Sequence, residues 1–203
     1  LANVMLDFLD GVWERQCKDL GLLVRYADDF VVLCRTRSAA EEALRRLGII
    51  LERLRLRLHP DKTRIVELGL GKGGFDFLGC HLRIMQSHFK GRTYLFRWPG
   101  PKAMKRIRSR VRGLTDRRRR AGIEGIREVI KDLNPVLRGW GNYFRTGNAS
   151  LKFQQIDRLV GKRLKRLMLR RGGYGRDTGT PKECSHERFV KDHGLHKLLG
   201  TIR

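Results

Sequence analysis

Apolar residues recur along this chain at two different periods, and the change between them predicts where helices and strands lie. Spacings of three and four residues predict a helix over residues 3–19 and a second helix that begins at the capping box Ser38-Ala39-Ala40-Glu41 and is ended by Pro60. Between these helices, two β-branched apolar runs flank a short polar break, which predicts a strand–turn–strand hairpin over residues 22–34. Short strands are expected further on, at residues 63–68, 75–77, 80–84 and 92–97.

Beyond the turn residues at 98–101, the apolar pattern is helical. Asn134-Pro135 is expected to break the second helix of this part, with Trp140, Tyr143 and Phe144 on the next one, and a Gly- and Thr-rich loop should precede a short helix around residues 186–193. Because each apolar stripe needs a partner, a helical bundle is expected. The predicted fold class is therefore α+β, with a small antiparallel sheet and its helices followed by an all-α bundle. The stripes are Met104, Ile107, Val111 and Leu114; Ile123, Ile126, Val129, Ile130 and Leu133; and Phe153, Ile156, Val160, Leu164 and Leu167.

The chain carries a formal net charge of +24, and this charge is uneven. Residues 1–97 hold 17 Lys and Arg against 12 Asp and Glu, whereas residues 98–203 hold 28 against 9. Such a field attracts polyanions. A membrane surface is less suitable than a nucleic acid, because the basic helices lack a broad apolar face rich in Trp and Phe. Nucleic acid is therefore the predicted partner, and no membrane is expected.

The sequence also bears on the compartment. Its four cysteines form no CxxC pair, which is typical of reduced cytosolic thiols. No apolar run approaches the ~18 residues needed to span a bilayer, and acidic residues interrupt the N-terminal apolar pattern where a signal peptide would need it continuous. A cytoplasmic (bacterial) or organellar location without a secretion signal is expected.

Two adjacent carboxylates, Asp28 and Asp29, stand at the tip of the predicted hairpin. An ionised carboxylate is costly to desolvate unless a cation or hydrogen bonds compensate it. Mg²⁺ suits such a pair, because it is held by one or two carboxylates together with substrate phosphates. The alternative is that the two residues only cap their own turn and face water.

The residues around this tip resemble a known family. Tyr26-Ala27-Asp28-Asp29, within Arg25-Tyr26-Ala27-Asp28-Asp29-Phe30-Val31-Val32-Leu33, resembles the palm motif of reverse transcriptases, specifically those encoded by group II introns. Three further matching motifs follow in the family's order, and the last resembles the signature of the maturase (thumb, or X) domain. The resemblance implies a partial reverse-transcriptase palm over 1–97, a basic helical thumb/maturase domain over 98–171, and a C-terminal loop and short helix over 172–203. The three motifs are Leu58-His59-Pro60-Asp61-Lys62-Thr63, Gly74-Phe75-Asp76-Phe77-Leu78-Gly79-Cys80 and Asn134-Pro135-Val136-Leu137-Arg138-Gly139-Trp140-Gly141-Asn142-Tyr143-Phe144-Arg145.

The resemblance implies RNA-directed DNA polymerisation by two Mg²⁺ ions that steady the attacking and leaving oxygens. Template RNA, a DNA primer and dNTP would be the partners, and binding of intron RNA would assist splicing. By resemblance, Asp28 is the principal metal ligand, with Asp29 in or beside the site, and Tyr26 and Ala27 line the nucleotide or primer side.

Two further positions are assigned in the same way. Lys62 resembles the lysine that approaches the triphosphate, and the alternative is a solvated turn lysine. Leu78 and Gly79 resemble the primer grip, where the backbone approaches the primer strand closely. The alternative for Gly79 is an ordinary β-turn glycine.

The family also requires a third aspartate from an earlier palm strand, and a fingers subdomain. Only 25 residues precede Tyr26, and Asp7 and Asp10 among them lack a strand context. We therefore expect the chain to be the C-terminal part of such an enzyme, inactive alone and completed by an upstream fingers–palm fragment. One alternative is a non-catalytic, maturase-like RNA-binding protein. Another is a basic ribosome-associated protein, which explains the charge but not the acidic tip.

Candidate RNA contacts lie in the basic half. The four arginines Arg117, Arg118, Arg119 and Arg120 could be merely solvated or could complement a helix dipole, but phosphate contact is expected in this setting. Arg138 and Arg145 are expected to be available to RNA. The aromatic residues Trp140, Tyr143 and Phe144 are expected to be core rather than a stacking platform. Zinc is not expected at Cys184, His186, His193 and His196, because a matched Cys pair is lacking.

Overall fold

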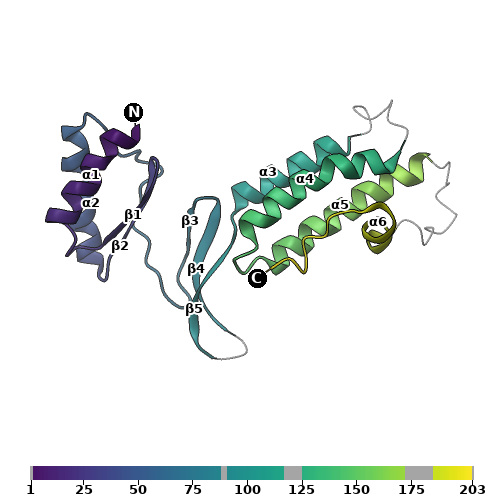
Figure 1. Ribbon diagram of the computed structural model, residues 1–203. Coiled ribbons are helices and arrows are strands. Elements are labelled where there is room, and N and C mark those ends of the chain that lie inside the picture. The colour runs from purple at the N-terminus through teal and green to yellow at the C-terminus, as the bar shows by residue number, and fades with distance from the viewer. Residues whose placement is uncertain (1, 88–90, 117–124, 172–184, 203) are drawn as a thin grey trace. The chain divides into compact units, whose positions relative to one another are not determined.

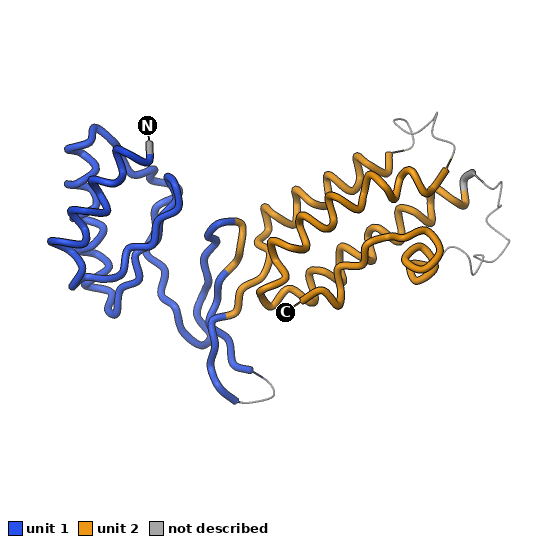
Figure 2. The backbone as a smooth tube through the Cα atoms, in the orientation of Figure 1, with its two compact units in different colours: residues 1–78, 82–95 blue, residues 79–81, 96–203 orange. Residues whose placement is uncertain are grey.

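The computed structural model describes residues 2–87, 91–116, 125–171 and 185–202. The chain divides into two compact units, one of residues 1–78 and 82–95 and the other of residues 79–81 and 96–203 (Figure 2). Each unit is described by itself below.

The first unit begins with α1 (Ala2–Gln16), the strands β1 (Leu22–Tyr26) and β2 (Asp29–Leu33), and α2 (Arg37–Arg53). The two strands pair antiparallel, which confirms the predicted hairpin. Both helices lie on one face of this hairpin (Figure 1). The core between them and the hairpin is formed by Leu6, Leu9, Val12, Trp13, Cys17, Ala43, Leu47, Ile50 and Leu51, with Leu23, Phe30 and Val32 packed against it.

The ends of α2 differ from the prediction. Its N-cap is Thr36 and not Ser38, since the Thr36 hydroxyl accepts the N–H of Ala39 at 3.2 Å. The helix stops at Arg53 rather than before Pro60. Arg55 takes a positive φ of 57°, and the N–H groups of Arg55 and Leu56 donate back to Glu52 and Leu51. This pattern is a Schellman motif with arginine at the position that usually holds glycine, so the sequence carried no stop signal there.

A three-stranded sheet follows, with the order β3 (Phe75–Phe77), β4 (Cys80–Gln86) and β5 (Thr93–Pro99). Leu78 and Gly79 join β3 to β4 with φ values of 49° and 75°, as a two-residue I′ turn requires. The expected strand over residues 63–68 is wrong, because this segment is irregular. No strand in the described part pairs with it, and β propensity without a partner does not make a strand.

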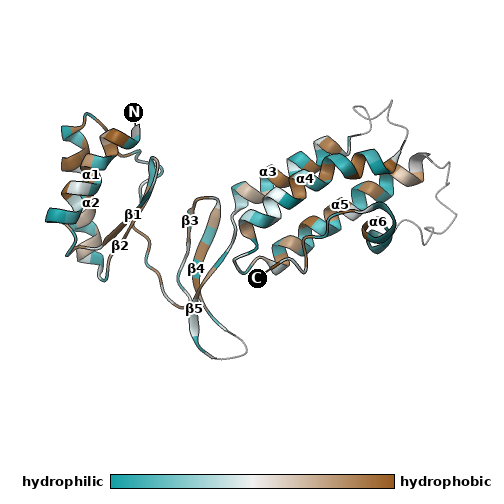
Figure 3. Ribbon diagram, in the orientation of Figure 1, coloured by the Kyte–Doolittle hydropathy of each residue, from teal (hydrophilic) through white to brown (hydrophobic). Residues whose placement is uncertain are grey.

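The second unit is helical, with α3 (Pro101–Leu114), α4 (Ile126–Phe144), α5 (Ser150–Arg171) and α6 (His186–His193). Apolar bands alternate with hydrophilic ones along these helices (Figure 3). The predicted stripe on α5 is confirmed, because all five of its residues are buried. The short helix α6 was also predicted correctly. Together with the sheets and helices of the first unit, these helices confirm the α+β fold class.

Asn134-Pro135 does not break the predicted second helix, so that prediction was wrong. Helix α4 continues through Pro135 to Phe144. A proline inside a helix costs one hydrogen bond and a clash with the preceding turn. Burial of one continuous stripe offsets this cost, since Val129, Ile130, Leu133 and Leu137 are each at most 1% exposed.

The C-terminal segment after α6 packs against α4 within this unit. Asn134 binds it from α4, donating to the Gly194 carbonyl at 2.8 Å and accepting the N–H of His196 at 2.8 Å. Leu198 is fully buried and lies against Gly141 of α4, where any side chain would collide with it. Within the described ranges, no helix is both long and apolar enough to cross a membrane.

Candidate catalytic turn and nucleic-acid interface

The acidic tip is a two-residue turn, Ala27-Asp28, closed by the pair Tyr26 and Asp29. All four residues are exposed. Ala27 has a φ of 54°, a left-handed conformation that residues other than glycine rarely adopt. Neither Asp28 nor Asp29 has an ion-pair or hydrogen-bond partner for its carboxylate among the described residues. Two neighbouring residues at this turn therefore carry exposed carboxylates without a partner in the described part.

Arg25 ties this turn to α1. Its Nε donates to both Asp10 carboxylate oxygens, at 2.9 Å and 3.0 Å, and its Nη2 donates to Asp10 Oδ2 as well. Its remaining nitrogen, Nη1, donates to the Ala27 carbonyl at 2.9 Å. The Arg25 side chain is only 14% exposed. The hydrogen bond to Asp10 raises the pKa of Arg25, so the guanidinium stays charged.

The turn fits a hard divalent cation only in part. Oxygen ligands from one or two carboxylates, completed by water and substrate phosphates, are what Mg²⁺ takes in proteins. In the described ranges, however, no three His, Cys, Asp or Glu side chains come together as a metal site. The turn can therefore supply two carboxylates, and the other ligands must come from outside the described residues. For the zinc candidates, Cys184 lies outside the described residues as well.

The other predicted palm residues lie in two separate turns. Lys62 is exposed in a turn where its own N–H and that of Thr63 donate to the His59 carbonyl, at 3.1 Å and 2.9 Å. No ion pair joins Lys62 to an acidic residue of the described part. Leu78 and Gly79 form the I′ turn, and the Gly79 carbonyl accepts the Gly100 N–H at 2.8 Å. Leu78 is thus a second non-glycine residue with positive φ at a hairpin tip.

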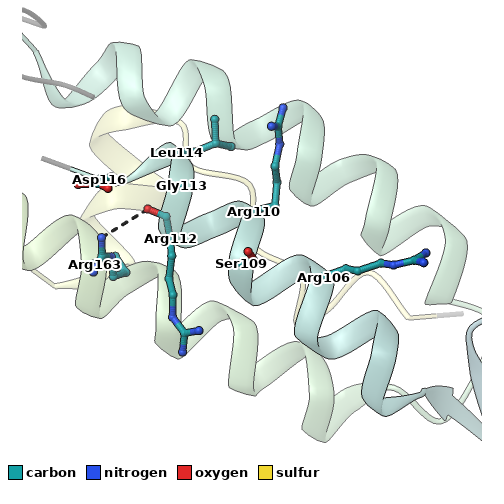
Figure 4. A pocket seen from close by; sticks show the side chains of 8 residues that line it. All are labelled: Arg106, Ser109, Arg110, Arg112, Gly113, Leu114, Asp116 and Arg163. Carbon is teal, nitrogen blue, oxygen red and sulfur yellow. Dashed lines mark hydrogen bonds between the residues drawn. The ribbon is translucent and has the colours of Figure 1, made fainter. Parts of the chain in front are cut away.

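The helical unit holds a basic pocket of about 840 Å³. Arg106, Ser109 and Arg110 project from α3, and Arg163 reaches across from α5 (Figure 4). Its full lining is Arg106, Ser109, Arg110, Arg112, Gly113, Leu114, Asp116 and Arg163.

Arg163 has a structural role in this pocket. It donates to the hydroxyl and the carbonyl of Thr115, both at 2.9 Å, and Thr115 is buried at the C-cap of α3. A guanidinium there satisfies carbonyls that the helix end leaves unpaired. Arg106, Arg110 and Arg112 line the pocket and remain exposed.

Comparison with known proteins separates the same two parts of the chain. Residues 1–82 match the reverse transcriptase (RNA-dependent DNA polymerase) family, and residues 104–176 match the group II intron maturase-specific domain. The chain belongs to the group II intron reverse transcriptases/maturases. No curated protein matches it.

In this reverse transcriptase/maturase, the first match contains the acidic turn, Lys62 and the Leu78-Gly79 turn, and the second contains the basic pocket. Both matches support reverse transcriptase and maturase function, and RNA and DNA binding in general. The family generally uses Mg²⁺. The assignment of individual residues stays a prediction.

The arginines predicted to contact RNA in the maturase part differ in their exposure to solvent. Arg138 is exposed on α4, and Arg145 is half-buried at its C-cap. The run Arg117, Arg118, Arg119 and Arg120 lies outside the described residues.

The aromatic residues of the maturase part are only partly core. Phe144 is buried and Trp140 is half-buried, with ring centroids 5.0 Å apart, and Trp140 also meets Phe153 at 5.4 Å. Tyr143 was wrongly expected in the core, since it is 58% exposed.

Sequence reasoning missed two elements of these sites. The first is the pair Arg25 and Asp10, whose only signal was a charged residue at an inward position of an apolar strand. The second is the α3 pocket, where Arg106, Ser109, Arg110 and Gly113 recur at helical spacing on one face. That spacing could have found it.

Proposed function

We propose that this chain carries the acidic turn of an RNA-directed DNA polymerase together with an RNA-binding unit that assists intron splicing. The observation that carries the proposal is the tip of the β1–β2 hairpin, where Asp28 and Asp29 are exposed and lack partners within the described residues. Carboxylates without compensation are suited to a divalent cation and its phosphate ligands. The substrates would be template RNA, a DNA primer and dNTP.

Mg²⁺, when bound, would steady the attacking and leaving oxygens of nucleotidyl transfer. The residues of the chain would hold and orient the reactants. Asp28, in the turn, would be the principal metal ligand, and Asp29 at the start of β2 would stand beside it. The exposed ring of Tyr26 would line the nucleotide or primer side, and Lys62 would contribute a mobile positive charge toward the triphosphate.

Catalysis is tested with the 203-residue chain, with and without a fingers–palm segment from a reverse transcriptase of the same family added in trans. Primer extension with Mg²⁺ should require the added segment, because the described residues bring no third ligand to the turn. In the completed enzyme, which is the chain together with the added fingers–palm segment, Asp28→Asn should abolish primer extension and leave RNA binding intact. Extension that persists in Asp28→Asn would exclude the catalytic assignment.

RNA binding would use the basic pocket of α3. Arg106 and Arg110 lie four residues apart on one helical face and are exposed, so both can meet successive phosphates of one strand. Arg138 and Arg145 would extend this interface. Replacing Arg106 and Arg110 by Gln should weaken RNA binding and lower the slope of log K against log salt by about 1 for each lost phosphate contact.

Arg158→Gln is the matched control for either single replacement, Arg106→Gln or Arg110→Gln, because Arg158 is exposed on α5 and does not line the pocket. An equal loss in the control would mean that only overall charge matters, and the pocket would not be an RNA site.

A second candidate is a maturase-like RNA-binding protein without catalysis. The lack of a three-ligand metal site in the described part favours it. RNA binding that depends on Arg106 and Arg110, combined with no extension in the completed enzyme, would select this alternative.

A further inference from the structure

Within the proposed polymerase site, the turn residue Ala27 poses a physical problem. Its φ of 54° carries the steric penalty of a left-handed L-residue, and the next residue is Asp28. Strained positions persist only where the surrounding structure fixes them. A two-stranded ribbon is marginally stable by itself, so the strands alone do not fix such a turn.

The contact that restrains the turn comes from Arg25. Its guanidinium uses two nitrogens on Asp10 of α1 and the third on the Ala27 carbonyl, at 2.9 Å. Arg25 lies on the inward face of β1, opposite Phe30, and its side chain is mostly buried. One side chain thus links a helix, a strand and the turn that bears Asp28.

The chemistry of this link specifies arginine. A planar fork with three nitrogens can hold a carboxylate with one edge and still donate sideways to a carbonyl. A lysine has a single nitrogen and cannot reach both groups in this arrangement. Neutral hydrogen bonds would hold the turn more weakly, because charge-assisted bonds are roughly twice as strong.

We propose that Arg25, oriented by Asp10, is a positioning residue that holds the Ala27-Asp28 turn in its strained conformation and so orients the Asp28 carboxylate for metal binding. This inference rests on the proposed function of Asp28. It gives Asp10 a role other than that of a metal ligand: the carboxylate is engaged by Arg25 and orients the guanidinium.

The test compares Arg25→Lys and Asp10→Asn with Arg37→Lys in the 203-residue chain. Arg37 also pairs with a carboxylate, Glu41, but that pair is exposed on α2 and does not touch the turn. The first readout is the amide resonances of residues 27–29 by NMR, without metal. The second is Mn²⁺ binding, followed by paramagnetic broadening at the same residues.

Both site variants should shift or broaden the amides of residues 27–29, leave those of α2 unchanged and weaken Mn²⁺ binding, whereas Arg37→Lys should match the wild type. In the completed enzyme, kcat should fall by on the order of tenfold to a hundredfold, because misplacement of a reacting group by about 1 Å costs this much. KM for dNTP should change little. The double variant, Arg25→Lys with Asp10→Asn, should lose no more kcat than the more impaired single variant, since both residues act through one contact.

The inference is overturned if residues 27–29 keep their wild-type resonances in both variants, even where the melting temperature falls, because Arg25 would then only stabilise the unit. This readout needs no activity. A wild-type chain that neither binds Mn²⁺ nor supports extension would instead overturn the proposed function, so the two failures are distinguishable.

Discussion

Asp157 Oδ1 accepts the backbone N–H of Leu198 at 3.0 Å, across 41 residues of sequence. Its second oxygen accepts the N–H of Leu199 at 2.9 Å. Asp157 is 6% exposed, and Leu198, which it binds, is fully buried. The C-terminal segment is therefore fixed to α5 by a buried acceptor that serves two backbone donors.

Asp157→Asn should destabilise the helical unit by about 1–3 kcal/mol. Asparagine keeps one oxygen acceptor, but its NH₂ group would face a backbone N–H and leave that donor unpaired. Chemical denaturation followed by circular dichroism measures the loss. Asp192→Asn, an exposed change on α6, should alter the midpoint little. Equal midpoints for both variants would show that the two hydrogen bonds contribute nothing net.

The sequence was sufficient where one local pattern decided the structure. Two β-branched apolar runs around a short polar break predicted the β1–β2 hairpin, and helical spacing predicted the buried stripe of α5. It was insufficient where tertiary packing overrode a local rule. Pro135 stays helical because its helix buries a continuous stripe, and Arg55 ends α2 in a conformation that favours glycine.

The candidate site divides in the same way. Asp28 and Asp29 are adjacent in sequence, so their proximity could be predicted from the motif. Arg25 and Asp10 are 15 residues apart, and their contact depends on how α1 crosses the hairpin. A contact between a helix and a hairpin leaves no periodic pattern in the sequence, so the pairing of Arg25 with Asp10 could not be predicted from it.

Gly147→Ala should destabilise the second unit, whereas Gly139→Ala should stabilise it. A Cβ at Gly147 would lie 2.5 Å from the Arg97 carbonyl oxygen, which also accepts the N–H of Asn148 at 2.6 Å. Backbone must then move, at a cost of about 1–3 kcal/mol. A Cβ at Gly139 meets nothing within 4 Å, so the helix should gain about 0.5–1 kcal/mol. Thermal melts of the two variants should shift in opposite directions, and shifts of the same sign would contradict this packing.

Acidification should weaken the docking of α6. Burial lowers the pKa of His186, and the positive charge of Lys197 lowers it further. The negative charges of Asp157 and Glu187 raise this pKa, but they do not cancel the effect of burial. The unfolded chain therefore binds a proton more readily than the folded one, so stability is full above the ordinary pKa of 6.5 and falls as pH drops through it. Melts between pH 7.5 and 5 measure this loss. His186→Gln should remove part of the pH dependence, and an unchanged pH profile would exclude His186 as its source.

Trp140 and Arg138 separate packing from recognition within the maturase part. Trp140 meets Phe144 and Phe153, and is half-buried. Trp140→Ala should therefore cost about 3 kcal/mol through lost burial and a cavity, and lower the melting temperature. Arg138→Ala with Arg145→Ala should keep the melt near that of the wild type and weaken RNA binding, with a shallower salt dependence.

Thermal unfolding and RNA affinity, measured side by side on both variants, decide between the two roles. The indole Nε1 of Trp140 is buried without a partner in the described part, so the expected loss of stability comes from the packing of the ring on Phe144 and Phe153. If Trp140→Ala melts normally and loses RNA, the ring stacks on bases, and the maturase part binds RNA through an aromatic face rather than through its arginines alone.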